Sequence, residues 1–475
     1  MKIDLSGLGI VPDLQISLKP LTVFVGENGT GKTWTAYTIA GMFGHYGFDK
    51  YVKAYLRGET AFRYTFVEEA INDLVEKGSA TVNVAEFSME HAETYINELA
   101  KLAPTWMNRF FATTRVDFGK MSIHAELSIA TKQALSSRLK DSGIKVEGFV
   151  GVKRESSKLR LTCLKEKGDD QLYFYTKYEK NDSEAIPPPV VEEEIKEFVV
   201  VTIFRIIGSA LFENVVIFPT ERTTFITLPF PHDQEEYREM DQLEKGTRPG
   251  RSGMAWRISQ PVGNLLGIIE SCMRQSSVGR EEKARDPKVI QLMRLGKFLE
   301  DEILLGNIST ERHGNQVELM YNPSEDVSLE LNVSSSMVKE LAPLALYLKC
   351  LAEPGDLLVI DEPEMNLHPA AQVELTEFLG MLVNAGLHVL ITTHSPYIVD
   401  HIPNLIRAND LDKEKVKDLF YLKQVTSFLA KDDVSVYLFE SDSVTDILKE
   451  DGDINWETFG NVSRDLSSIY SGLIE

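Results

Sequence analysis

Apolar and polar positions follow a regular order over the first part of the chain. Segments 2–5 and 14–18 alternate polar and apolar residues, as half-buried strands do. The continuous apolar run over 21–25 indicates a strand buried on both faces, and residues 34–43 have a helical pattern. This order predicts a strand, a tight loop and a helix near the beginning of the chain.

Helical spacing then dominates from about residue 50 to 110. One helix ends at Gly78, and a second runs through Tyr95 to Pro104. Their apolar stripes are typical of helices packed on a core, so we assign them no separate function.

Residues 114–180 have a β-rich pattern. Segments 159–164 and 172–178 alternate on either side of Gly168-Asp169-Asp170, which predicts a hairpin. The aromatic residues of the second segment could stack nucleic-acid bases, but a covered sheet face accounts for them better.

The triple proline at 187–189 predicts a boundary before an apolar helix over 199–212. A strand over 214–218 follows, and it ends at Pro219-Thr220-Glu221-Arg222.

From 228 to 312 the sequence is polar and helical, which we interpret as a protruding arm. Basic residues around 246–251 and 280–285 could contact nucleic acid or a partner. Because glutamates interrupt them, a solvated face is the better interpretation.

The loop after the buried strand has the pattern of a phosphate-binding P-loop, Gly26-Glu27-Asn28-Gly29-Thr30-Gly31-Lys32-Thr33. Its glycines allow successive backbone N–H groups to face one anion, and the following helix adds the positive end of its dipole. We expect Lys32 to reach the β- and γ-phosphates of ATP and the Thr33 hydroxyl to ligate Mg²⁺. A chance glycine-rich turn is the competing interpretation, and the flanking strand and helix count against it.

Two carboxylates end a second buried strand far downstream. The apolar run 357–360 is followed by Asp361, Glu362 and Pro363. A parallel strand beside the P-loop strand would place both acids at the carboxyl edge of the sheet, where α/β proteins bind ligands. Asp361 would then hold the Mg²⁺ shell, and Glu362 would be the general base for the attacking water.

Two further elements lie near these carboxylates in the sequence. The apolar strand 388–393 ends at His394, which could donate a hydrogen bond to the γ-phosphate or the attacking water. Ser334, Ser335 and Ser336 open a helix after the alternating segment 327–333. They can be simple N-caps, or a γ-phosphate site at a helix N-terminus.

Composition narrows the function classes. The chain has 475 residues and a formal net charge of −22, which repels nucleic acid unless a local patch or a partner intervenes. Its three cysteines lie far apart without metal-ligand spacing, so we expect inert thiols in a reducing compartment. No secretory signal or membrane-spanning run is evident, and we expect a cytoplasmic protein without membrane contact.

The P-loop, the three serines, the Asp361-Glu362 pair and His394 resemble the ABC-type ATPases of the SMC, RecF and OLD-like branch. The stretch Asn366-Leu367-His368-Pro369 is similar to the D-loop of that family, and Pro219-Thr220-Glu221-Arg222 to an element of its OLD-like members. The resemblance implies an α/β fold with an ABC-type P-loop ATPase head, a mixed β-sheet with flanking helices, that carries an α+β insertion and a helical arm. It also implies ATP and Mg²⁺ as cofactors, and a head-to-tail homodimer in which each ATP is completed by the partner's serines.

The resemblance covers roughly the segments 1–45, 212–225 and 315–400. On this basis we expect the head to consist of three separated segments, 1–45, 196–227 and 313–475. Segment 46–195 would then be an inserted helical and β-hairpin region, and 228–312 the helical arm.

Three functions compete within this family. A transporter ATPase is disfavoured because whole inserted lobes separate Thr33 from Asp361. A DNA-repair ATPase of RecF or SMC character would need long heptads or a basic face. We therefore favour an OLD-like ATPase of a bacterial antiphage module, similar to the PARIS and Septu ATPase subunits. No nuclease constellation follows His394, so we expect a separately encoded effector, a nuclease or toxin. The dimer could extend to a higher oligomer, and any nucleic-acid contact would be indirect.

Overall fold

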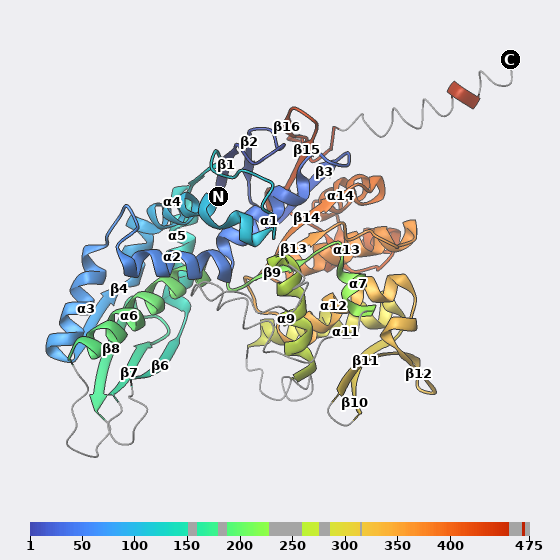
Figure 1. Cartoon of the computed structure of the whole chain (residues 1–475). Helices are drawn as coiled ribbons and strands as arrows, with labels where there is room; N and C mark the ends of the chain where they lie inside the picture. The colour runs from blue at the N-terminus through green and yellow to red at the C-terminus, as the bar shows by residue number, and fades with distance from the viewer. Residues whose placement is uncertain are drawn as a thin grey trace.

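The structure is a computed structural model that describes residues 1–150, 159–178, 188–227, 259–274, 286–313, 316–455 and 468–470. Its centre is a six-stranded sheet, with one lobe built from the N-terminal half of the chain and another built from the C-terminal half (Figure 1). No helix in the described ranges is both long and apolar enough to cross a membrane.

The central sheet has the strand order β16-β15-β3-β14-β13-β9. Its strands are β3 (Leu21–Gly26), β9 (Val215–Phe218), β13 (Leu357–Asp361), β14 (His388–Thr393), β15 (Val434–Phe439) and β16 (Val444–Asp446), and only β16 pairs antiparallel. Strand β14 lies between β3 and β13, so the expectation that the Asp361 strand is adjacent to the P-loop strand is wrong. Because all three strands are parallel, their carboxyl ends still meet at one edge.

Alternate residues of the sheet face two separate cores. In β13, Leu357 and Val359 belong to the first core, whereas Leu358 and Ile360 belong to the second. The first core contains α1 (Lys32–Phe43) and the N-terminal lobe; the second contains α12 (Ser336–Cys350), α13 (Pro369–Asn384) and α14 (Pro396–Asn409). This burial of both faces explains why the central strands are continuously apolar.

The N-terminal lobe combines two small antiparallel sheets with helices. One sheet has the order β2-β1-β5 and the other β4-β8-β7-β6. Its strands are β1 (Lys2–Ser6), β2 (Leu14–Ser17), β4 (Ser79–Asn83), β5 (Ser122–Glu126), β6 (Ile144–Val150), β7 (Leu159–Lys165) and β8 (Gln171–Tyr178). Its helices are α2 (His45–Arg57), α3 (Thr65–Lys77), α4 (Val84–Phe110), α5 (Ile129–Asp141) and α6 (Pro188–Leu211).

The predicted hairpin is confirmed, since β7 and β8 pair antiparallel from Leu159 opposite Tyr178 to Leu164 opposite Tyr173. The covered-face interpretation of its aromatics holds for Phe174, which is fully buried, but not for Tyr175, which is 43% exposed on the other face.

The β-rich prediction for 114–180 is confirmed by β5, β6, β7 and β8, although helix α5 lies between β5 and β6. Two other details of the sequence-based prediction in this lobe are wrong. Helix α4 continues past Pro104 to Phe110, because Trp106 and Phe110 extend its buried stripe and packing outweighs the lost backbone hydrogen bond. The predicted start of the apolar helix at 199 is wrong: α6 begins at Pro188, within the triple proline, and the first turn of a helix tolerates proline.

The described helices of the predicted arm are α9 (Gln260–Arg274) and α11 (Pro287–Phe298). Leu265 and Leu292 on these helices lie in the second core, and the helices pack against β9 and α12, so they do not protrude. The segments 246–251 and 280–285 lie outside the described residues.

A third small sheet, β10-β11-β12, extends away from the second core (Figure 1). It consists of β10 (Asn307–His313), β11 (Gln316–Ser324) and β12 (Val327–Glu330). The strand predicted over 327–333 is therefore shorter, and its last three residues form a 3₁₀ turn, Leu331–Val333. The remaining described elements are α7 (Arg222–Thr227), α15 (Lys413–Val416), a π-helical turn (Leu299–Leu304) and the 3₁₀ turns Lys417–Leu419, Val425–Ser427 and Lys431–Asp433.

Candidate nucleotide site

The P-loop joins β3 to α1 in a conformation that needs glycine. Gly26 has a φ of 148°, and a Cβ there would lie 2.1 Å from the carbonyl oxygen of Phe439. Gly31 has a φ of 95°, and its Cβ would lie 2.5 Å from Val11 Cγ2. Helix α1 begins directly after Gly31 without an acidic residue in its first turn. The free N–H groups and dipole of this helix terminus therefore favour an anion.

Lys32 is held beneath the loop. Its Nζ donates hydrogen bonds to the carbonyl oxygens of Gly26 at 3.0 Å and Glu27 at 2.6 Å, and only 4% of the residue is exposed. Burial lowers the pKa of Lys32 to about 8, although the carboxylates of Glu362 and Asp361 oppose that shift. The ammonium group is therefore available to phosphates at neutral pH.

Asp361 is buried at the end of β13 and accepts hydrogen bonds from four hydroxyl groups. Its Oδ1 accepts from Thr33 Oγ1 at 2.8 Å and from Thr392 Oγ1, and its Oδ2 accepts from Tyr37 at 3.1 Å and from Thr220 at 3.4 Å. Burial raises the pKa of Asp361, and the hydroxyl donors oppose the shift. The Thr33 and Asp361 oxygens are the hard donors that Mg²⁺ prefers, so the two residues fit the predicted metal role.

Glu362 and His394 form a pair at the same edge. Glu362 Oε1 lies 3.3 Å from His394 Nε2, and the hydrogen bond from His394 lowers the pKa of Glu362. Glu364 holds the backbone at His394. Its Oε1 accepts hydrogen bonds from Thr393 Oγ1 at 2.7 Å and from the backbone N–H of His394 at 2.6 Å. The geometry thus provides an ionised carboxylate beside the imidazole of His394, whose backbone is held by Glu364.

The three serines lie at the start of α12. Ser335 is the N-cap and accepts from the Val338 backbone N–H at 3.3 Å, and Ser334 donates to the Leu331 carbonyl oxygen at 2.7 Å. Ser335 and Ser336 are exposed, whereas Ser334 is buried. Within the described chain no hydrogen bond links these serines to the P-loop residues.

The structure adds residues that the sequence analysis did not assign to the site. Tyr37 lies four residues after Thr33, so helical spacing could have placed both hydroxyls on one face. Thr392 is the penultimate residue of β14, the strand beside β13, and its place near the end of that apolar run could have indicated its position at the carboxyl edge. Arg222 belongs to the Pro219–Arg222 motif, and its guanidinium donates to the carbonyl oxygens of Asp361 at 2.6 Å and Glu362 at 2.8 Å.

A family model described as "AAA domain, putative AbiEii toxin, Type IV TA system" matches residues 301–400. Lantibiotic transport ATP-binding protein SrtF of Streptococcus pyogenes is 27% identical over 140 residues, which cover 27% of this chain and 58% of that protein. The matched region therefore spans little more than half of this curated relative.

Solved structures of two kinds also align. A Smc head domain with an extended coiled coil, derived from Pyrococcus furiosus, has a TM-score of 0.34 and 10% identity, with 99% of this chain and 98% of that chain covered. The recombination mediator RecF has a TM-score of 0.30 and 11% identity, with 94% and 97% covered. At these TM-scores the likeness carries no further conclusion. The strand–loop–helix geometry, the family model and the curated relative support an ABC-type P-loop ATPase head within the α/β fold.

Proposed function

We propose that the chain binds ATP with Mg²⁺ and hydrolyses it, and that this cycle makes it the nucleotide-dependent sensor and scaffold subunit of a bacterial antiphage defence system. The 2.8 Å hydrogen bond between Thr33 and Asp361 is the observation that carries the ATPase proposal, because it joins the P-loop to the acidic strand end. The Glu362–His394 pair at the same edge supplies groups for hydrolysis.

Each residue has a defined role in this proposal. Lys32 and the P-loop N–H groups hold the phosphates, and Thr33 and Asp361 hold Mg²⁺ directly or through water. When bound there, Mg²⁺ would supply charge neutralisation for the phosphates. Glu362 takes a proton from the attacking water, and His394 orients that water and the carboxylate.

The exposed Ser335 and Ser336 support a head-to-tail homodimer. They lie at the N-terminus of a 15-residue helix, where backbone N–H groups and hydroxyls can meet a phosphate of the partner's ATP. Dimer assembly would then depend on ATP, and this dependence would be the switch that the subunit uses.

The defence role is supported by the family model's AbiEii description, which names a toxin of a toxin–antitoxin system. We propose that the effector is encoded separately, as a nuclease or toxin, and that the nucleotide state of this chain holds or releases it. Co-expression of the chain with its genomic neighbours, followed by tag purification and mass spectrometry, tests this role. A stoichiometric nuclease or toxin would support the role, and its absence would contradict it.

The ATPase activity is tested separately, by phosphate release from ATP with and without Mg²⁺. Hydrolysis should require Mg²⁺ and should disappear in Lys32→Ala. Retained hydrolysis in that variant would contradict the assignment of the P-loop.

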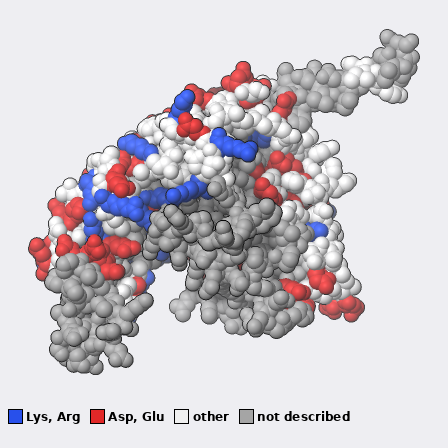
Figure 2. Space-filling view, viewed as in Figure 1, with Lys and Arg blue, Asp and Glu red and all other residues white. Residues whose placement is uncertain are grey.

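One surface feature favours the second candidate, a RecF- or SMC-like ATPase in DNA repair. Figure 2 shows a run of Lys and Arg side chains over the lobe that contains α2. Lys50, Lys53 and Arg57 follow one another at helical spacing on that helix. If DNA or a recombination protein is recovered in place of an effector, and Lys53→Glu with Arg57→Glu prevents that recovery, the repair function takes precedence.

A further inference from the structure

Arg222 is the largest fully buried side chain among the described residues. It contacts the backbone on both sides of Glu362, the proposed general base. Its Nη1 donates to the carbonyl oxygens of Pro219 at 2.9 Å and Asp361 at 2.6 Å, and its Nη2 donates to the carbonyl oxygen of Glu362 at 2.8 Å. One guanidinium therefore holds the peptide groups before and after the Cα of Glu362.

The backbone held in this way has an unusual conformation. Glu362 has a φ of 48°, in the left-handed region that side-chain-bearing residues seldom adopt. Such a conformation persists only where surrounding contacts enforce it, and it is found mostly at functional sites. The hydrogen bonds from Arg222 are contacts of this kind.

A carboxylate on α12, the helix that begins with Ser336, balances the charge of Arg222. Glu340 on α12 forms an ion pair with Arg222, and the two side chains are 0% and 2% exposed. Glu340 also accepts hydrogen bonds from Thr223 Oγ1 at 3.0 Å and from Asn366 Nδ2 at 3.4 Å. Glu340 lies four residues after Ser336, on the adjacent turn of α12.

We propose that Arg222 and Glu340 are positioning residues that hold Glu362 in its left-handed conformation and connect it to the first turns of α12. A buried ion pair is costly to separate, so a movement of this helix start would carry Glu340, Arg222 and the Glu362 backbone together. This inference rests on the proposed function, in which α12 contacts the partner's ATP. ATP bound at one site of the dimer would thereby set the position of the base at the other site.

The same helix offers a matched control. Lys349, one residue before the C-terminal end of α12, forms an ion pair with the buried Glu300, and the two side chains are 16% and 3% exposed. Lys349 and Glu300 also bond to the backbone of Ile308 and contact no residue of the nucleotide site in the described structure. This pair shares the helix and includes a buried carboxylate, but it lacks the contacts to Asp361 and Glu362.

The test compares two double variants in the full-length chain: Arg222→Met with Glu340→Leu, and Lys349→Met with Glu300→Leu. Replacing both charges leaves no unpaired buried ion, so both proteins should fold. Thermal unfolding, affinity for a fluorescent ATP analogue, KM and kcat are measured for each. We expect the first variant to keep its ATP affinity and KM within about twofold and to lose about tenfold or more in kcat, because displacing a reacting group by a fraction of an ångström has effects of this size. The control should keep its kcat within about twofold.

A second measurement tests the connection to α12. In a Glu362→Gln chain, we expect ATP to slow hydrogen exchange of the segment 361–367 and of the P-loop. Adding Arg222→Met and Glu340→Leu should abolish the slowing in 361–367 and preserve it in the P-loop.

The outcomes separate the two levels of the proposal. If the wild-type chain neither binds nor hydrolyses ATP, the proposed function fails, and this inference fails with it. If the wild-type chain hydrolyses ATP, then wild-type kcat in the Arg222/Glu340 variant, an equal loss in the Lys349/Glu300 control, or unchanged exchange in 361–367 overturns the positioning role alone.

Discussion

The two ends of strand β14 each have a histidine, in contrasting environments. His388 opens the strand at the amino edge of the sheet, and His394 follows its last residue at the carboxyl edge. Burial lowers the pKa of His388 to about 4, and its ring packs edge-on against Phe212 at 5.2 Å between centroids. The His394 side chain is 26% exposed and lies against the Glu362 carboxylate.

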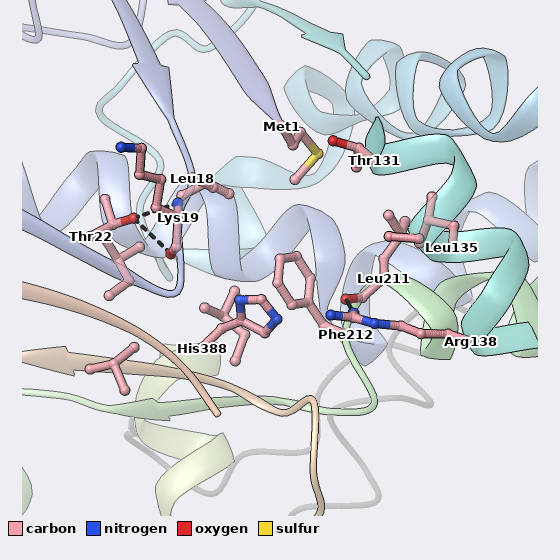
Figure 3. Close-up of a pocket in the computed structure, with 14 residues that line it drawn as sticks. Met1, Leu18, Lys19, Thr22, Thr131, Leu135, Arg138, Leu211, Phe212 and His388 are labelled. Carbon is pink, nitrogen blue, oxygen red and sulfur yellow. Dashed lines mark hydrogen bonds between the residues drawn. The ribbon is translucent and has the colours of Figure 1, made fainter. Parts of the chain in front are cut away.

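The surroundings of the two edges explain this contrast. At the amino edge, His388 lines a cavity of about 110 Å³ together with apolar side chains such as Leu135 and Phe212, and Arg138 also faces it (Figure 3). At the carboxyl edge, carboxylates, hydroxyls and a helix N-terminus meet. The same strand therefore has a neutral, packed histidine at its amino end and a histidine beside the Glu362 carboxylate at its carboxyl end.

The largest effect should come from Glu362→Gln at the carboxyl edge. The amide keeps the shape of the side chain but cannot accept a proton, so we expect kcat for ATP hydrolysis to fall about 100-fold or more while ATP affinity stays within about twofold. Phosphate release and binding of a fluorescent ATP analogue measure these quantities.

The matched control is Glu213→Gln, which changes a carboxyl next to β9 whose pKa is raised by burial. It should leave kcat unchanged. Normal hydrolysis by Glu362→Gln would disprove the assignment of the general base.

At the amino edge, His388→Leu should change stability and leave hydrolysis unchanged. The pKa of His388 is about 4 in the fold, against 6.5 for an ordinary histidine, so the unfolded chain binds the proton first as the pH falls. Stability is therefore lost as the pH falls through 6.5 toward 4, and His388 should account for about 2 kcal/mol between pH 7 and 5. Urea unfolding at both pH values should show a smaller loss in the leucine variant; equal losses would contradict this interpretation.

The contrast also shows what the sequence can predict. The P-loop, Asp361, Glu362 and His394 could be placed at one edge because each follows a short apolar run, and parallel strands end together. Strand order could not be obtained in this way, since β13 and β14 have the same apolar pattern and either could lie beside β3. Contacts such as Arg222 with Glu340 depend on which helix turns meet in space, and each residue alone has the pattern of an ordinary surface charge. Helix α4 continued past Pro104 because tertiary packing outweighed a local signal.

His394→Ala should have an intermediate effect. Without the imidazole, the attacking water and Glu362 are less well oriented, so we expect kcat to fall about tenfold. His394 lowers the pKa of Glu362, and its removal should raise that pKa. Because the base acts when ionised, the acid limb of the pH–kcat profile should shift to higher pH. The pH–kcat profile of His388→Leu is the control and should coincide with the wild-type profile. If the profile of His394→Ala also coincides with it, His394 does not influence the ionisation of Glu362.

The smallest effect concerns the protonation of Lys32 itself. Burial lowers its pKa to about 8, so the ammonium group is present below that pH and is lost as the pH rises through it. If ATP binds only the charged form, the apparent Kd should rise about fourfold between pH 7 and 8.5. Lys32→Arg provides the comparison, because a guanidinium keeps its charge over this range and its Kd should not change with pH in the same way. Titration of both proteins with a fluorescent ATP analogue at several pH values measures the difference. If the Kd of the arginine variant changes with pH as much as the wild-type Kd does, the pH dependence comes from another group of the site. Lys32 would then keep its charge between pH 7 and 8.5.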